Sequence, residues 1–563
     1  MKAIPPGDGG HDMELLRKHH QRIINIAALA ALAVCFALTV RTAWYATQIL
    51  DGDASAEMAL ANLLYREGGI FAKNWIYSTE IRAFYCVQIF RLFFGLFEDW
   101  HLVRFAGTVT LLAMYLASWG GLSRRLKAGT VGFGLGGCLL MLPFSVVYGR
   151  IVLYHSYYIC YAIEGFLIVT LNLALWQDRR ALHRCLHGAA LFLVALISGL
   201  SGVRLMLTTI APLLCAALCS AVHFRRDEEP AAKQWLGILL RLIPGGIAAV
   251  GFGAGYLINS RVLAAQYNFS SYDSTWLRED VPNILHVLLK HFFVDFGYDA
   301  DRPLMSVQGV LSVLGVLAAL ALLVLAVWAM LSKSTTEGEQ LLGGLAGWAC
   351  GIIGLCFLLT YNTTESYYYC LHMLLSVLWL VPLPAVMLGT AIREDRLCPD
   401  GRRTLSLLCA GVLGCNGLVV TRFFTDPDSW QLTYEGLTWQ DTRTAQKLQG
   451  AVDFLTANGY TLGGADTWYD NIITELSDGR VRAFPILNYQ DHLYVYYWLM
   501  DTTLLTPKDG GGRSFILLPV EDVAKNTAML ENIGAEQVYA DEYFAVYGLP
   551  DEASLLNALT PYT

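Results

Sequence analysis

The sequence predicts a polytopic α-helical membrane protein with a small α/β domain at its C-terminal end. Hydrophobic residues make up 55% of the 563 positions and charged residues only 15%, a balance that exceeds what one soluble core uses. Apolar stretches of about 20 residues, the length of a helix that crosses a bilayer, recur up to residue 422. Beyond residue 423 the composition becomes that of a mostly soluble domain.

The apolar stretches predict about eleven transmembrane helices. They cover residues 23–43, 102–122, 129–148, 157–176, 188–203, 205–222, 236–258, 304–331, 341–361, 368–390 and 404–422. Two short helices must share residues 188–222, and a single long helix there would invert the topology of everything that follows. The first stretch is too long for the apolar core of a signal peptide, so it predicts an uncleaved anchor.

Basic residues fall in alternate loops, as at 124–127, 179–184 and 393–403. By the positive-inside rule these loops are cytoplasmic. We therefore expect a multi-pass plasma-membrane protein with a cytoplasmic N-terminus and an extracytoplasmic C-terminal domain, in which residues 44–101 and 259–303 form long outer loops. The net charge of −8 follows this topological pattern, so no nucleic-acid partner is implied.

The first outer loop is predicted to contain two helices that lie on the membrane surface. Apolar residues recur at helical spacing after Ser55 and again over residues 81–94. Between these stretches, Gly68 and Gly69 turn the chain, and the aromatic residues that follow suit a membrane interface. The outer loop at 259–303 shows a further apolar period over residues 284–292, which predicts another surface helix.

Three carboxylates, Asp51, Asp53 and Glu57, stand just beyond the first span. Acidic side chains at a bilayer surface suggest chemistry on a lipid-borne substrate. The alternative is structural, because Asp51 and Asp53 suit the N-cap and first turn of a helix, and Glu57 suits the same turn. Glu80 either caps the second surface helix or contacts an acceptor or a metal.

An Asp soon after the first span, followed by two surface helices separated by a Gly-rich and aromatic segment, resembles the GT-C superfamily of membrane glycosyltransferases. Its members include the protein O-mannosyltransferases and the aminoarabinose transferase of lipid A. The resemblance covers about residues 20–422 and rests chiefly on residues 44–150 and the topology. It implies a sugar donor linked to polyprenyl phosphate, used at the outer face, and a loop Asp acting as base or metal ligand. By position Asp53 is the first candidate and Asp51 the second.

The chemistry asks for such groups independently. Displacing a phosphate from an anomeric carbon needs a proton acceptor for the nucleophile and positive charge for the departing phosphate. The outward-facing cations are Arg82, Arg104, Arg150, His155, Arg204, Arg261, Lys290 and His291. Arg204 stands out in an apolar segment, where a charge costs roughly 3 kcal/mol and faces a cavity or a partner. Snorkelling to lipid head groups is the alternative for Arg204, and an interfacial aromatic belt is the alternative around Arg150 and His155.

Metal use stays open at this point. Mg²⁺ or Mn²⁺ could bind Asp51 and Asp53, whereas no cysteine or histidine has the spacing of a structural zinc site. The thirteen cysteines fall almost entirely within or beside the spans, so a disulfide framework is not expected.

The chain is thus expected to divide into a transmembrane GT-C-like glycosyltransferase domain at 1–422 and a soluble α/β domain at 423–563. In the latter, helices are predicted at 442–458 and 521–533 and strands at 481–486, 515–520 and 544–547. This alternation favours a small α/β sandwich. A cluster of aromatic residues at 494–498 could stack on sugar rings, although core packing or membrane contact explains it equally well.

The sequence therefore predicts a cell-envelope glycosyltransferase, mannosyltransferase-like in architecture, that moves a hexosyl or pentosyl group from a polyprenyl-phosphate donor to a glycan, lipid or protein acceptor. Arg150, His155, Arg204, Lys290, His291, Glu57 and Glu80 are its candidate substrate contacts. Two rivals remain. A lipid or amphiphile transporter would show broken helices in matched halves with midplane charges, and a non-catalytic GT-C-like scaffold would tolerate loss of Asp51 and Asp53.

Overall fold

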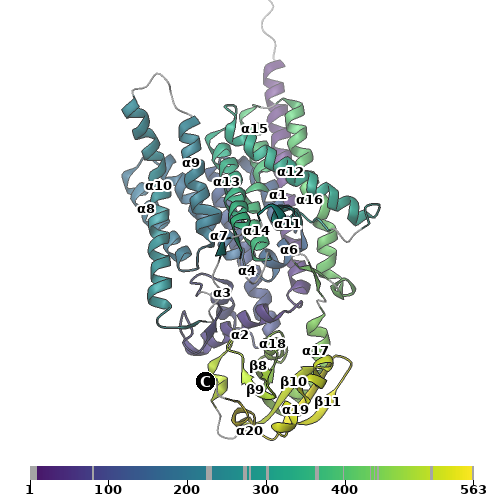
Figure 1. Cartoon of the computed structure of the whole chain (residues 1–563). Coiled ribbons are helices and arrows are strands. Elements are labelled where there is room, and N and C mark those ends of the chain that lie inside the picture. Colours follow the sequence, from purple (N-terminus) through teal and green to yellow (C-terminus); the bar gives the residue numbers. More distant parts are fainter. Residues whose placement is uncertain are drawn as a thin grey trace, which may run out of the picture.

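A computed structural model gives the architecture of the chain (Figure 1). It describes residues 9–78, 81–223, 231–269, 276–277, 281–299, 303–361, 367–396, 398–431, 433–435, 438–440, 443–506 and 511–560. A bundle of long helices fills most of the molecule. The start of α1 and the C-terminal α/β region lie at opposite ends of this bundle (Figure 1), and the end next to the α/β region is called the domain end below.

The bundle is built from the helical segments that follow. They are α1 (Gly9–Ala46), α4 (Trp100–Arg125), α5 (Gly129–Met141), α6 (Val146–Tyr148), η1 (Gly149–Tyr154), α7 (Ile159–Gln177), α8 (Ala181–Gly199), η2 (Met206–Ile210), α9 (Ala211–His223), α10 (Ala231–Leu257), η3 (Ile258–Leu263), α11 (Val281–Val294), α12 (Val307–Leu331), α13 (Glu337–Leu359), α14 (Tyr367–Leu380), α15 (Leu383–Glu394) and α16 (Pro399–Thr425).

Within the described part of the chain, eight helices are long and apolar enough to cross a membrane, or nine if one bent pair counts as a span. The other two of the eleven predicted spans correspond to the shorter apolar helix Met206–Ala221 and to α16. The two predicted helices at 188–222 are confirmed, because α8 ends at Gly199 and η2 begins at Met206. The multi-pass membrane architecture is therefore confirmed.

The bent pair departs from the single straight span predicted at 129–148. Residues Gly129–Met141 and Val146–Tyr154 meet at 91°. Pro143 lies in the break, where its ring removes a helical hydrogen bond and disfavours a helical conformation for Leu142, which is extended. The segment after the bend continues as the π-helix η1, whose Gly149 allows close contact with Phe424. The bend carries η1 across the domain end rather than through the bundle.

The segment between α1 and α4 contains α2 (Gly52–Glu67), β1 (Ile76–Tyr77) and α3 (Cys86–Phe93), which confirms two helices in the first outer loop. Asp51 caps α2 through its side chain, and Gly68 ends it with φ +74°, a left-handed conformation that favours glycine. The strand β1 pairs in parallel with β2 (Asn268–Phe269), and β3 (Trp276–Leu277) pairs with β4 (Thr360–Tyr361). The predicted helix at 284–292 is α11, and it packs against α13 and α14.

The C-terminal region contains a six-stranded mixed sheet in the order β11-β12-β10-β7-β8-β9. Its elements are η4 (Pro427–Gln431), β5 (Thr433–Glu435), β6 (Thr438–Gln440), α17 (Thr444–Ala457), β7 (Tyr460–Ala465), α18 (Asp470–Leu476), β8 (Arg482–Tyr489), β9 (His492–Val495), η5 (Thr502–Leu505), β10 (Arg513–Pro519), η6 (Val520–Asp522), α19 (Val523–Asn532), β11 (Glu536–Ala540), β12 (Phe544–Leu549) and α20 (Glu552–Asn557). The expected α/β character is confirmed, with three strands of the sheet beyond those predicted, β7, β9 and β11, and with a separate antiparallel pair, β5 and β6.

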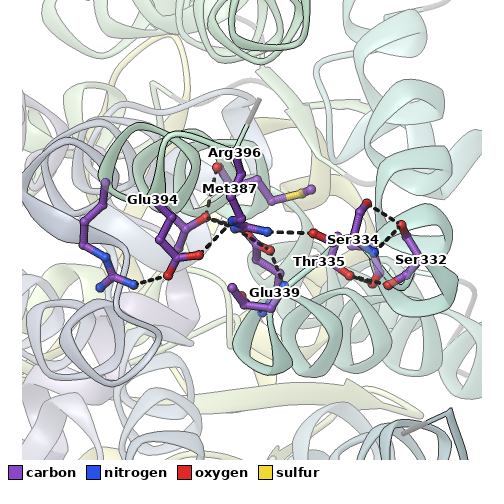
Figure 2. A network of polar contacts seen from close by, with 11 residues as sticks. Ser332, Ser334, Thr335, Glu339, Met387, Glu394 and Arg396 are labelled. Atoms are coloured by element: carbon purple, nitrogen blue, oxygen red, sulfur yellow. Dashed lines mark hydrogen bonds and ion pairs between the residues drawn. The ribbon is translucent and has the colours of Figure 1, made fainter. Parts of the chain in front are cut away.

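A polar network joins the loop before α13 to the end of α15 (Figure 2). The Arg396 guanidinium donates to both carboxylate oxygens of buried Glu339, at 3.0 and 3.2 Å, and to the Ser334 carbonyl at 2.7 Å. Thr390 also donates to Glu339. Because Glu339 is only 1% exposed, its charge needs these donors.

We expect Arg396→Ala to lower the thermal stability of the protein by about 2 kcal/mol, because it removes charge-assisted hydrogen bonds from a buried carboxylate. The apparent melting temperature in detergent measures the effect. Arg403→Ala is the matched control, since Arg403 is 79% exposed and lies 3.9 Å from Asp400; its loss should be nearly silent. Equal melting temperatures for both variants would contradict this role.

Candidate functional site

Asp51 is held from several sides where α2 begins. One oxygen, Oδ1, accepts from the Ala54 N–H and from the Tyr157 hydroxyl, each at 2.7 Å. The other, Oδ2, pairs with the Arg150 guanidinium and lies 3.4 Å from Nδ1 of His155. Burial raises the pKa of Asp51, but Arg150, His155 and Ala54 together hold that pKa well below its usual range. Asp51 is therefore ionised at neutral pH and is a poor proton acceptor.

The side chains that contact Asp51 come from the part of the chain that follows the 91° bend. Arg150 belongs to η1, and His155 and Tyr157 lie in the short turn between η1 and α7. Burial lowers the pKa of His155 against the opposing effect of Asp51, so the imidazole is mostly neutral at pH 7. The fold thus brings together three predicted residues, Asp51, Arg150 and His155, and adds Tyr157.

Asp53 and Glu57 lie four residues apart, on one face of α2. Asp53 is exposed. The Glu57 side chain is 16% exposed, and its Oε1 lies 3.5 Å from Nη1 of Arg82. Burial raises the pKa of Glu57 to about 7, with Arg82 opposing and Asp53 reinforcing the rise. A carboxyl group that titrates near neutral pH is suited to proton transfer.

Two arginines stand among tyrosines beside this acidic face. The Arg82 guanidinium lies 4.4 Å from the centre of the Tyr85 ring. Arg204 donates to the Tyr161 hydroxyl at 3.3 Å and lies 5.7 Å from the Tyr158 ring centre. We call Arg82, Arg204 and these three tyrosines the basic–aromatic cluster. Its positive charge, next to the carboxylates of α2, could bind an anionic group such as a phosphate.

Solved structures resemble this arrangement of helices. The crystal structure of ArnT from Cupriavidus metallidurans in the apo state aligns with a TM-score of 0.51 and 11% identity, over 94% of this chain and 99% of that chain. The same protein bound to undecaprenyl phosphate aligns with a TM-score of 0.43 and 12% identity, over the same shares. The chain has a GT-C fold.

Two comparisons by sequence find nothing. No family model matches the chain, and no curated protein matches it. The likeness to the apo structure thus extends over nearly the whole of both chains and lies in the fold. It confirms the architecture predicted from the first outer loop and the topology.

Arg104, one of the outward-facing cations considered above, serves a different purpose in this GT-C fold. Its guanidinium is fully buried and donates to both carboxylate oxygens of Glu475, at 2.8 and 2.6 Å, and to the Ala54 carbonyl at 2.9 Å. Glu475 belongs to α18 of the C-terminal region, so Arg104 fastens that region to α2 and α4. Because the guanidinium is fully buried and paired with Glu475, we assign Arg104 a structural role rather than a contact with a substrate phosphate.

The remaining predicted residues lie elsewhere. His291 is buried on α11, with its ring centre 5.6 Å from that of Phe357 on α13, and Lys290 precedes it in the same helix. Arg261 is exposed in η3. Glu80 lies outside the described residues. In the described part of the GT-C fold, only Asp51, Asp53, Glu57, Arg150, His155 and Arg204 among the predicted site residues gather around α2 and the basic–aromatic cluster.

A metal site at Asp51 and Asp53 was left open by the sequence. The arrangement of side chains does not favour it, because the Arg150 guanidinium occupies one Asp51 oxygen and two hydrogen bonds occupy the other. Among the described residues, no group of three or more histidine, cysteine, aspartate or glutamate side chains could hold an ion.

The sequence offered an interfacial aromatic belt around Arg150 and His155 as an alternative to a site, and it did not predict the contacts of Tyr157 with Asp51 or of Tyr158 and Tyr161 with Arg204. The only signal was the density of tyrosines just after Arg150. The bend at Pro143 turns η1 toward α2 and so brings these tyrosines to the site.

Proposed function

We propose that the protein is a glycosyltransferase that moves a hexosyl or pentosyl group from a polyprenyl-phosphate donor to an acceptor at the outer face of the plasma membrane. One observation carries this proposal: in a GT-C fold, three carboxylates stand at the start of α2, and one of them, Glu57, lies 3.5 Å from Arg82 of the basic–aromatic cluster. The domain end is then extracytoplasmic, the N-terminus cytoplasmic, and residues 1–422 and 423–563 form the membrane and soluble domains.

The reaction follows from the groups present. A hydroxyl or amine of the acceptor forms a bond to the anomeric carbon of the sugar while the bond from that carbon to the phosphate oxygen breaks. The proton of the nucleophile goes to a carboxylate, and the electron pair leaves with polyprenyl phosphate. Arg204 and Arg82 stabilise the charge that develops on the departing phosphate.

The carboxylates divide the work according to their surroundings. Asp53 is exposed and meets the acceptor, with Glu57 one turn further along the same face. These two groups form the proton-accepting pair. Asp51, fixed by Arg150 and Tyr157, positions the start of α2 and keeps Arg150 in place. A glycan, a lipid or a protein hydroxyl would all satisfy this chemistry as acceptor.

The test is consumption of a panel of polyprenyl-phosphate sugars by the detergent-purified chain, with and without Mg²⁺ or Mn²⁺. We expect one donor to be consumed, and its consumption to collapse in Asp53→Asn and to fall less in Asp51→Asn. Asp453→Asn is the matched control, because Asp453 is exposed on α17 and far along the chain from the site.

Two outcomes would refute the proposal. One is that no donor of the panel is consumed or bound by folded protein. The other is that both site variants match the wild type, in which case the GT-C fold serves transport or scaffolding here.

A further inference from the structure

A small cavity lies inside the first outer loop, enclosed by α2, the segment at 70–78 and the start of α3. Its volume is about 40 Å³. The wall includes the charged pair Glu57 and Arg82, the aromatic rings of Phe71, Trp75 and Tyr77, and one residue from the C-terminal region, Leu499. A water molecule needs roughly 10–15 Å³ on this measure, so the cavity as it stands has room for a few waters only.

One wall residue carries a buried polar group that lacks a hydrogen-bond partner. The Trp75 side chain is 1% exposed, and its indole N–H has no hydrogen-bond acceptor in the part of the chain that the structure describes. Buried donors are nearly always satisfied, because an unsatisfied one loses its hydration without compensation. Because its nitrogen is inaccessible to water, this donor does not face the cavity, and it marks the tight packing of the wall.

Leu499, another residue of the wall, holds an unusual conformation. Its φ is +45°, in the left-handed region that a bulky side chain rarely adopts. The flanking backbone fixes it there: the Leu499 carbonyl accepts from the Asn471 side chain at 3.2 Å, and the Met500 carbonyl accepts from the Ile76 N–H at 2.9 Å. Strain of this kind persists only where the surroundings impose it, and it gathers at ligand clamps and switches.

Backbone hydrogen bonds also join the segment at 499–502 to the segment at 74–76. Besides the Ile76 bond, the Thr502 N–H donates to the Asn74 carbonyl at 2.8 Å, and Trp75 pairs with Asp501 as an isolated bridge. The segment at 499–502 therefore closes the cavity as an added edge along 74–76. Release of this edge would relieve the strain at Leu499 and open the cavity.

We propose that this cavity is the subsite for the sugar ring of a substrate and that Leu499, supplied by the C-terminal region, is the residue that closes it and limits the size of ring admitted. Aromatic faces cover the apolar side of a pyranose, while the charged pair Glu57 and Arg82 faces its hydroxyl groups. The inference rests on the proposed transferase function, but it concerns binding and is tested by binding.

The probes are methyl hexopyranosides and methyl pentopyranosides, observed by saturation-transfer difference NMR with the full-length protein in detergent. We expect Leu499→Ala to strengthen the binding of at least one methyl glycoside about tenfold, and Leu499→Trp and Glu57→Gln to weaken it at least tenfold. Leu505→Ala is the matched control, because Leu505 lies six residues further on, packs against the sheet core and does not line the cavity.

A second variant separates strain from space. Leu499→Gly removes the same side chain as Leu499→Ala but tolerates positive φ, so it should bind the glycosides equally well and melt at a higher temperature. Binding unchanged in Leu499→Trp and Glu57→Gln, or no binding even in Leu499→Ala, would overturn the inference. Binding that depends on these residues without any donor turnover would uphold the subsite and refute the transferase.

Discussion

Glu475→Gln is expected to destabilise the protein by about 3–5 kcal/mol, because it leaves the Arg104 guanidinium buried without its counter-charge. The Arg104 and Glu475 side chains are only 1% and 5% exposed, so water cannot replace the lost carboxylate. Since Glu475 lies on α18 and Arg104 on α4, the loss should also loosen the C-terminal region from the bundle. We expect a lower apparent melting temperature and faster maleimide labelling of Cys86, which is buried at the start of α3.

Arg66→Gln provides the matched control for this prediction. Arg66 also bonds across to the C-terminal region, to Asp501 at 3.0 Å, but its side chain is 44% exposed. An exposed pair of this kind contributes at most about 1 kcal/mol. The double variant Arg104→Met with Glu475→Leu should recover part of the loss, because it removes both charges. If Glu475→Gln has the same melting temperature as the wild type, the buried pair of Arg104 and Glu475 does not hold the two regions together.

The sequence predicted the architecture well where long, continuous patterns carry the signal. Apolar stretches located the helices, whereas the orientation that the basic loops indicate stays a prediction. Local capping signals were equally informative: Asp51 begins α2 and Gly68 ends it, as their side-chain chemistry dictates. The missed strands β7, β9 and β11 are short or rich in glycine and polar residues, and only their neighbours in the sheet make them strands.

The site was harder to predict because it depends on distant parts of the chain. Arg104 and Glu475 are 371 positions apart, and no local pattern shows that they meet. For the same reason Asp51 could not be separated from Asp53: two neighbouring carboxylates look alike in sequence. Arg150, His155 and Tyr157, which follow the bend at Pro143, surround Asp51, whereas Asp53 is exposed.

Donor turnover is expected to rise with pH through about 7, which is the pKa that burial gives Glu57. Below that pH Glu57 is protonated, so the proton-accepting pair of Asp53 and Glu57 lacks the negative charge of Glu57. Above that pH the ionised Glu57 carboxylate pairs with Arg82 and supports proton removal by Asp53. We expect Glu57→Gln to lose about 100-fold in turnover at pH 8 and to lose the dependence on pH near 7. The measurement is a profile of kcat/KM against pH for both proteins.

Stability should change with pH in the opposite sense, which separates this effect from a general loss of folding. A carboxyl group whose pKa is raised from 4.5 to about 7 binds its proton more tightly in the folded state. Its contribution to stability is therefore present at low pH and declines as the pH rises from about 4.5 to 7, by about 3 kcal/mol at most. The groups that face Glu57 include Asp53, Arg82, Tyr85 and Arg104, and the pKa values of Arg82, Tyr85 and Arg104 are all raised further above the range of pH 5 to 8.

Between pH 5 and pH 8 the melting temperature of the wild type should accordingly fall relative to that of Glu57→Gln, while the turnover of the wild type increases. Glu67→Gln is the control, because Glu67 ends the same helix, is exposed, and accepts hydrogen bonds from the Lys73 backbone N–H and the Asn74 side chain. If kcat/KM still rises near pH 7 in Glu57→Gln, another group is responsible for the pH dependence. A stability difference that does not vary with pH would show that burial does not raise the pKa of Glu57, and the carboxylate would then act in substrate binding alone.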